Sequence, residues 1–98
     1  MMPGIQLIAP ITTNHVLAEV KAQDEFVGKT LRQLDFRNRF GLNIVAIKQR
    51  EATTTPEGGE KIEYHVNDLP HGDDVIEEGD ILVVIGSDDQ VRDLQTGY

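Results

Sequence analysis

Alternation of apolar and polar residues marks two segments of this sequence as half-buried β-strands. In residues 15–22 (HVLAEVKA) and 61–67 (KIEYHVN), an apolar residue recurs at every second position, and most of the residues between are polar. Successive side chains of a strand point to opposite faces, so one face of each segment is expected to contact a core. The residues predicted to point inward are Val16, Ala18 and Val20 in the first strand and Ile62, Tyr64 and Val66 in the second.

Two further segments contain continuous apolar runs, which are typical of strands covered on both faces. Residues 43–50 contain the run IVAI and predict a central strand, and residues 81–86 (ILVVIG) predict another buried strand. A shorter apolar piece, residues 5–8, is closed by Pro10. It is either an edge strand or the tail of a linker, so both interpretations of residues 1–14 stay open.

A first short helix is predicted over residues 31–36. Thr30 is a favourable N-cap for it. Leu31 and Leu34 are three residues apart and lie on one face, which is expected to contact the core. Residues 35–40 either continue this helix or form a second short turn.

Further residues of the helical segments predict an ion pair and helix caps. Arg32 and Asp35 are three residues apart and are expected to pair on the exposed side of the first helix. Gly41 is suited to a left-handed C-cap. A terminal helix over residues 90–95 is capped by residues 87–89, which are Ser-Asp-Asp. The residues of this helix predicted to point inward are Val91 and Leu94.

Polar segments separate these elements. Residues 51–60 (EATTTPEGGE) indicate a loop at the tip of a long hairpin, and residues 68–74 (DLPHGDD) indicate a second loop. Residues 75–80 predict a turn that carries Val75 and Ile76 into the core. No repeat or domain boundary is visible, so the chain predicts one α+β domain with a small, mostly antiparallel sheet and two or three short helices.

Composition limits the classes of protein to which this chain can belong. Its 98 residues are 39% hydrophobic and 27% charged, as expected for one small globular domain that a subunit partner would stabilise. The absence of cysteine excludes disulfides and thiol catalysis and fits a reducing cytoplasm. No apolar run approaches the roughly 18 residues of a membrane span, and no signal peptide is recognised, so no direct membrane insertion is expected.

Positive charge is concentrated between residues 28 and 50. This segment, the basic island, holds six of the nine Lys and Arg residues and one acid, a net charge of +5. The whole chain carries −8, so the remainder carries −13, which argues against non-specific binding of nucleic acid. A basic island in an acidic protein indicates a site for an anionic ligand.

Catalytic and metal chemistry find little support in the sequence. Ser87 stands in a helix cap and not in a nucleophile elbow, so no catalytic residue is expected and a small acidic enzyme is the weakest interpretation. The three histidines are too far apart in sequence to suggest a zinc site. The acidic pairs, expected to be solvated or to cap helices with a divalent-cation site as the lesser alternative, are Asp73–Asp74, Glu77–Glu78 and Asp88–Asp89.

Several motifs follow one another in a defined order. They are Glu19-Val20, FVGKTL at 26–31, RFGLNIVAI at 39–47, Pro70, and IEEGDILVVIG at 76–86. Their order and spacing resemble the RCK-C domain, also called TrkA-C, the C-terminal regulatory domain of cytoplasmic subunits that gate potassium channels and transporters. The sequence resembles most the version from the Ktr-type potassium uptake system. The resemblance covers about residues 15–95, but residues 49–66 are longer than usual and predict an extended hairpin.

The resemblance implies a homodimer that binds the bacterial messenger cyclic di-AMP in the cleft between two copies. A two-fold ligand suits a two-fold dimer, in which each residue contributes twice. It also implies a preceding Rossmann-like RCK-N domain, of which these 98 residues contain no G-x-G-x-x-G fingerprint, and a membrane potassium-translocating subunit. The protein would then lie in the cytoplasm, peripheral to the membrane through the transporter complex.

Individual roles follow from the same resemblance. Arg39 matches an arginine that reaches phosphate. Ile44 and Pro70 would sandwich each adenine, His71 would add a hydrogen bond, and Leu34 would close the floor. The implied ligand-binding residues are Leu34, Arg39, Asn43, Ile44, Val45, Pro70 and His71.

Each of these residues also has a structural interpretation without a ligand. Arg39 is otherwise a solvated surface residue, and for Arg32 and Arg37 that interpretation is favoured. Ile44 and Val45 would belong to the core of any fold with this pattern. The functional alternatives are therefore a dimerisation domain with no nucleotide ligand, or a domain that binds another small anion or a cation.

Overall fold

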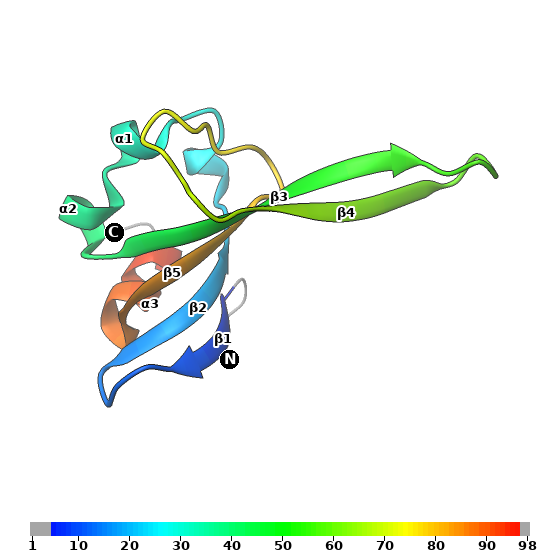
Figure 1. Cartoon of the computed structure of the whole chain (residues 1–98). Coiled ribbons are helices and arrows are strands. Elements are labelled where there is room, and N and C mark those ends of the chain that lie inside the picture. Colours follow the sequence, from blue (N-terminus) through cyan, green and yellow to red (C-terminus); the bar gives the residue numbers. More distant parts are fainter. Residues whose placement is uncertain (1–4, 97–98) are drawn as a thin grey trace.

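The computed structural model describes residues 5–96, which form a five-stranded antiparallel sheet in the spatial order β1-β2-β5-β3-β4 (Figure 1). The strands are β1 (Ile5–Pro10), β2 (His15–Lys21), β3 (Asn43–Thr54), β4 (Glu60–Asn67) and β5 (Ile81–Ser87). The helices are the 3-10 turn η1 (Asp24–Phe26), α1 (Leu31–Leu34), α2 (Phe36–Phe40) and α3 (Asp88–Thr96). The predicted α+β class is confirmed, while the homodimer stays a prediction because the structure describes one chain.

β1 is an edge strand, which decides between the two interpretations of the N-terminal segment. It pairs with β2, with a bulge between Leu7 and Ala9. The first four residues lie outside the described part of the chain. The predicted inward face of β2 is confirmed, since Val16, Ala18 and Val20 are all buried.

The core lies between one face of the sheet and the helices. β5 is the central strand, and its apolar residues 82–84 are buried as predicted. α3 packs on β5 and β2 and buries Val91 and Leu94, also as predicted. Three phenylalanine rings close the other end of the core, with Phe36 edge-on to Phe26 at 5.3 Å between ring centroids. Burial of these apolar side chains is the main favourable term in folding.

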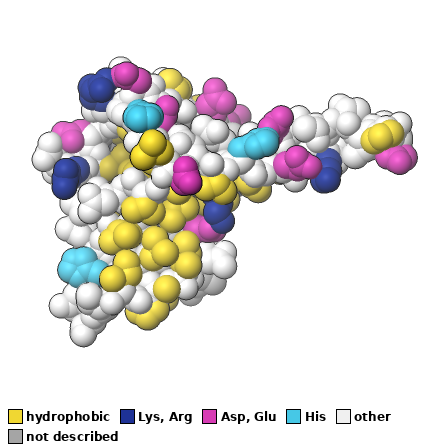
Figure 2. Space-filling model, in the orientation of Figure 1, with side chains coloured by type: hydrophobic (Ala, Val, Ile, Leu, Met, Phe, Trp, Pro, Cys, Tyr) yellow, Lys and Arg dark blue, Asp and Glu magenta, His cyan; other side chains and the backbone are white. Residues whose placement is uncertain are grey.

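β3 is an internal strand, as predicted, but its two faces differ. It lies between β5 and β4, with a bulge between Ile44 and Ala46. Within the apolar run only Ile47 is buried, whereas Val45 is 36% exposed. The expected cover on both faces is therefore wrong for the single chain, because α3 and the phenylalanine rings lie against one face only. Figure 2 shows hydrophobic side chains gathered over the body, below the projecting strands in that view.

The helix predicted over residues 31–36 is α1, which ends earlier, at Leu34, and a separate helix, α2, begins at Phe36. Thr30 caps α1 as predicted, because its Oγ1 accepts a hydrogen bond from the Gln33 amide (3.1 Å) and its own amide donates to Gln33 Oε1 (2.9 Å). Asp35 adopts a left-handed conformation with φ of +49°, which ends α1. The alternative of a second short turn is confirmed by α2, which Gly41 ends in a left-handed cap as predicted.

Arg32 and Asp35 do not form the expected pair. Arg32 forms an ion pair with Asp73, and Asp35 Oδ2 accepts a hydrogen bond from Asn38 Nδ2 at 3.0 Å. The prediction assumed a continuous helix, and the left-handed Asp35 removes the geometry that brings residues three apart together. The helix side chains that contact the core, as predicted, are Leu31 and Leu34.

β3 and β4 continue beyond the body as a two-stranded arm, residues 49–66 (Figure 1). The long hairpin is confirmed, and the chain measures 48 Å along its longest axis against 27 and 24 Å across. The loop predicted over 51–60 is too long, because β3 runs on to Thr54 and β4 begins at Glu60. Residues 51–54 therefore extend the ladder instead of forming a loop.

The arm exposes the side chains that alternation predicted to be buried. Ile62, Tyr64 and Val66 are 41%, 46% and 60% exposed. The prediction of an inward face is wrong for the single chain, because no described helix or strand lies over this face of the arm. Alternation identifies a face suited to burial, but it does not identify what covers it.

The turn before β5 carries one core residue and not two. Ile76 is fully buried, but Val75 is 45% exposed. The buried carboxylate of Asp80 accepts hydrogen bonds from the amides of Glu77 (2.9 Å) and Arg50 (3.3 Å). Asp80 therefore ties the base of the arm to this turn. None of the described helices is long and apolar enough to cross a membrane.

Candidate ligand-binding groove

A groove of about 440 Å³ lies between α1, α2, the start of β3 and the loop over residues 68–74. Basic, polar and apolar side chains meet in it. The residues that bear on its chemistry are Arg32, Arg37, Asn43, Ile44, Pro70 and Gly72. Apolar walls with a few polar groups are typical of a small-molecule site.

Two left-handed residues bring the sides of the groove together. Asp35 bends the chain between α1 and α2, and Gly41, with φ of +71°, turns it into β3. A Cβ at Gly41 would also contact the end of the flexible Gln90 side chain, which would have to move. Glycine suits this position chiefly because it reaches positive φ at no steric cost. Asn43 and Ile44 consequently begin β3 at the groove.

The loop that carries Pro70 is tied to α1 through the backbone. The first two amides of α1 donate hydrogen bonds to the carbonyl oxygens of Asp74 (3.0 Å) and Gly72 (2.9 Å). The side chain of Arg32 adds an exposed ion pair with Asp73, which contributes little by itself. The backbone bonds therefore hold Pro70 in the wall of the groove.

Asp74 fixes the shape of the same loop. Its Oδ2 accepts hydrogen bonds from the His71 amide (2.8 Å) and from Asn67 Nδ2 (2.9 Å). The His71 backbone bond lowers the pKa of Asp74 most, and the Asn67 bond lowers it further, while partial burial opposes the shift. Both bonds favour the charged carboxylate, so the folded loop and the ionised side chain support each other.

Acidification is expected to loosen this loop. The folded pKa of Asp74 lies below its ordinary value of 3.8, so its contribution is complete above that value and is lost as pH falls through the folded pKa. NMR should show the His71 amide signal moving toward its unstructured position as the pH falls below about 4. The step should vanish in Asp74→Asn and persist in Asp73→Asn. A His71 signal that stays constant over this range would contradict the assignment.

Three of the seven residues implied by the resemblance line the groove. They are Asn43, Ile44 and Pro70. Ile44, from β3, is partly buried and packs against the core, while Pro70 comes from the loop. Together they give the groove two apolar walls from separate elements, with a side-chain amide at its edge.

The other four lie outside the lining of the groove. Leu34 is buried in the core at 2% exposure, and Val45 is exposed on β3. His71 contributes its backbone amide to the loop. Arg39 lies over the ring of Phe40, with 5.2 Å from its guanidinium carbon to the ring centroid, and donates to the Leu34 carbonyl at 3.4 Å. The roles of all seven residues toward a ligand shared by two copies stay predictions.

Arg32 and Arg37 are exposed, as the sequence favoured for both, and they line the groove. The basic island held both residues, but no local motif separated them from its other cations. Their placement depends on the left-handed turn at Asp35. No glycine or proline at this position indicates the turn in the sequence. Arg32 is already paired with Asp73, whereas no ion pair engages Arg37 within residues 5–96. Arg37 is therefore available to an anionic ligand.

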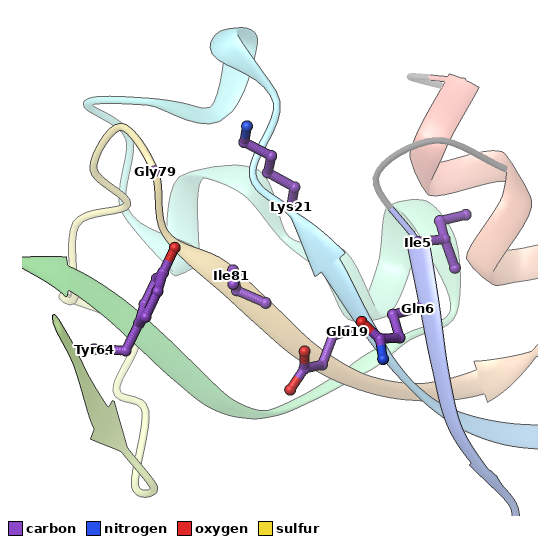
Figure 3. Close-up of a pocket in the computed structure, with 7 residues that line it drawn as sticks. All are labelled: Ile5, Gln6, Glu19, Lys21, Tyr64, Gly79 and Ile81. Atoms are coloured by element: carbon purple, nitrogen blue, oxygen red, sulfur yellow. The ribbon is translucent and has the colours of Figure 1, made fainter. Parts of the chain in front are cut away.

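A second hollow of about 290 Å³ lies where the arm meets the sheet (Figure 3). It is bordered by Ile5, Gln6, Glu19, Lys21, Tyr64, Gly79 and Ile81. Glu19 is ion-paired with Lys48, and none of the residues implied by the resemblance lies in this hollow. The described part of the chain also brings no three potential metal ligands of the His, Cys, Asp or Glu type together. The groove is the stronger candidate for an anion.

Comparison of sequences finds relatives of this chain. The profile of the TrkA-C domain family matches residues 15–65, which include Arg39 and Asn43 but not Pro70. The chain is 37% identical over 78 residues to Ktr system potassium uptake protein C of Bacillus subtilis (strain 168). That alignment covers 79% of this chain and 29% of the relative, so the chain spans less than a third of the relative's length.

Comparison of structures finds the same fold. The RCK C domain of potassium transport protein KtrA, solved in complex with cyclic diadenosine monophosphate (c-di-AMP), matches with a TM-score of 0.67 and 27% sequence identity. The match covers 86% of this chain and 84% of that one. The GsuK RCK domain matches with a TM-score of 0.62 over 86% of this chain and 16% of that one, at 20% identity, which shows the fold alone.

Proposed function

The chain belongs to the TrkA-C domain family, and from that premise we propose that it is a ligand-sensing regulatory domain of a bacterial potassium-transport subunit. Its ligand is cyclic di-AMP, bound between two copies of the chain. The observation that carries the proposal is the groove, where Arg37 lies beside apolar walls from Ile44 and Pro70. The similar KtrA domain, which was solved with this nucleotide, supports the same ligand.

Each part of the nucleotide has a matching group in the groove. An adenine ring offers two flat faces, which suit the apolar side chains of Ile44 and Pro70. The Asn43 amide both donates and accepts, as the edge of adenine requires. A phosphate at the α2 side meets the positive charge of Arg37 through charge-assisted hydrogen bonds. One groove thus accommodates one half of the two-fold nucleotide.

A second copy completes the site in this proposal. Arg39 and the His71 side chain are exposed and lie outside the lining of the groove in one chain. They reach the ligand from the rim of the cleft once a second copy closes over it. Binding regulates transport because the nucleotide favours one arrangement of the two copies over others.

The partners of the whole protein follow from the family in the same proposal. A Rossmann-like RCK-N domain precedes this domain, and a membrane potassium-translocating subunit receives the signal. The assembly then places the domain in the cytoplasm, at the membrane through the translocating subunit. The role is regulatory and not catalytic, and the ligand is a messenger and not a cofactor.

Thermal unfolding with and without cyclic di-AMP tests the ligand. At about 100 times its dissociation constant, the nucleotide adds roughly 2.7 kcal/mol to the free energy of unfolding. For a domain of this size the expected rise in Tm is about 10 °C or more. Circular dichroism measures the unfolding transition. Cyclic di-GMP and ATP are the controls and should produce little shift. No shift with any nucleotide would favour a dimerisation domain without a nucleotide ligand.

A further inference from the structure

β4 leaves a complete strand edge unpaired on the outside of the arm. It is the last strand in the spatial order, and within residues 5–96 it pairs only with β3. Its eight residues, Glu60–Asn67, present backbone groups that can pair with another strand. Two-stranded ribbons are marginally stable in water, so an arm of this length gains from a third strand.

The arm separates its side chains by chemistry. Residues opposite each other on antiparallel strands share a face, so the register assigns each face directly. One face carries Ile62, Tyr64 and Val66, opposite Ala52, Arg50 and Lys48 of β3. The other face carries Lys61, Glu63 and His65, opposite Thr53, Glu51 and Gln49. β4 is therefore apolar on one face and charged on the other.

We propose that β4 pairs edge to edge with β4 of a second copy of this chain, antiparallel and centred on Tyr64. In this register Tyr64 lies opposite Tyr64 of the second copy, and Ile62 lies opposite Val66. On the other face, Glu63 lies opposite His65, an acidic group against a basic one. The contact is isologous, since each residue of one copy meets its counterpart through the same two-fold axis. The two sheets join into one continuous sheet.

Neighbouring registers are less complementary. A centre at Glu63 places two Glu63 carboxylates opposite each other, and like charges directly opposite are destabilising. A centre at Ile62 places Tyr64 opposite Glu60 and moves Val66 beyond the partner strand. A centre between two residues brings the apolar face beside the charged one. The sequence of β4 thus favours the Tyr64 register.

The charged side chains are already held on the face where this register uses them. His65 forms an ion pair with Glu51, and Lys61 forms one with Glu63 at 3.0 Å. Pairing would place His65 between two carboxylates, Glu51 of its own chain and Glu63 of the second copy. The arm extends to the opposite side of the body from α2 (Figure 1), so pairing leaves the groove open. This contact is therefore separate from the nucleotide cleft.

Single-cysteine variants test the register, because the chain has no cysteine of its own. In Tyr64→Cys the two thiols lie on the two-fold axis, with Cα atoms about 4.5–5.5 Å apart, within reach of a disulfide. Ile62→Cys is the matched control, since residue 62 has the same face and similar exposure, 41% against 46%. In the proposed register residue 62 lies opposite residue 66 of the second copy. The two residues 62 are therefore four positions apart along the strands, roughly 13 Å, which a disulfide cannot span.

Mild oxidation with diamide at micromolar protein, without nucleotide, gives the readout on a non-reducing gel. Dimers of Tyr64→Cys are expected to form roughly ten times faster than dimers of Ile62→Cys. A mixture of Ile62→Cys with a tagged Val66→Cys should form the mixed dimer, because the register places these residues opposite each other. Equal rates for the two single variants, faster crosslinking of Ile62→Cys, or no dimers would each overturn the proposal. None of these outcomes depends on cyclic di-AMP.

Discussion

Replacing Phe36 with alanine is expected to lower the free energy of unfolding by about 4 kcal/mol. Phe36 is 3% exposed, and its ring lies 5.3 Å from that of Phe26 and 5.9 Å from that of Phe40. The truncation leaves a cavity at the centre of this cluster and removes both aromatic contacts. The free energy of unfolding of a native protein is about 5–15 kcal/mol in total, so this single change removes a large share of it.

Urea unfolding followed by far-UV circular dichroism measures this loss, because the chain has no tryptophan to serve as a fluorescent probe. Phe36→Leu is the matched control: it keeps most of the apolar volume and is expected to cost about 1–1.5 kcal/mol. A cost for Phe36→Ala no larger than that of Phe36→Leu would show that the three rings do not hold this end of the core together.

Replacing Arg39 with alanine is expected to weaken cyclic di-AMP binding by about a hundredfold or more. In a two-fold dimer the change removes two arginines from one ligand. A hydrogen bond to a charged group contributes about 1.5–3 kcal/mol, so two such losses amount to at least about 3 kcal/mol. Stability should change little, because the Arg39 side chain is exposed and its contacts with the Phe40 ring and the Leu34 carbonyl lie at the surface.

Isothermal titration calorimetry of Arg39→Ala beside two control variants measures this effect. Arg92→Ala removes the same charge from α3, where Arg92 is paired with Asp89 and lies outside the groove, and should leave affinity unchanged. Arg37→Ala should weaken binding by about tenfold, as expected for one weaker contact per copy. Unchanged affinity in Arg39→Ala would remove Arg39 from the site, and a larger loss in Arg37→Ala would make Arg37 the main phosphate contact.

The sheet could be predicted from the sequence because its signals are local. Alternation in β2 and the apolar run of β5 gave the buried faces of both strands. The helix caps could be predicted for the same reason. The Thr30 side chain accepts a hydrogen bond from the Gln33 amide, and Ser87 Oγ accepts one from the Gln90 amide at 3.1 Å. Each of these features depends on residues within a few positions of one another, so the sequence contains the whole signal.

The left-handed turn at Asp35 could not be predicted in the same way. Aspartate tolerates positive φ but does not require it, so nothing in the sequence separates the end of α1 from a continuous helix. This turn decides which cations of the basic island enter the groove. Arg37 and Arg32 are exposed as predicted, but their place along the groove could not be predicted from the sequence.

The arm shows a different limit. The alternation of Ile62, Tyr64 and Val66 identifies a face suited to burial, and the single chain leaves that face exposed. A sequence pattern reports what can be buried, whether the cover comes from the same chain or from another. The face of β3 that carries Val45 is likewise apolar in sequence but exposed in the single chain.

The candidate site was predictable in part. Asn43 and Ile44 lie at the start of a strand that the pattern predicts, and the resemblance implied Pro70 beside them; all three line the groove. The roles of these three toward a ligand, like those of Leu34, Val45, His71 and Arg39, remain predictions, because a site between two copies depends on how the copies approach. That approach is a property of the assembly, and one chain does not contain it.

The stoichiometry of cyclic di-AMP binding tests the central claim most directly. Titrating the nucleotide into the domain in a calorimeter, with the mass of the complex measured by sedimentation, gives the number of ligands per chain. The account predicts one nucleotide for two chains, because a two-fold ligand is shared by two grooves, and β4 pairing joins such units without changing this ratio. One nucleotide bound to each chain, or no binding at all, would contradict it.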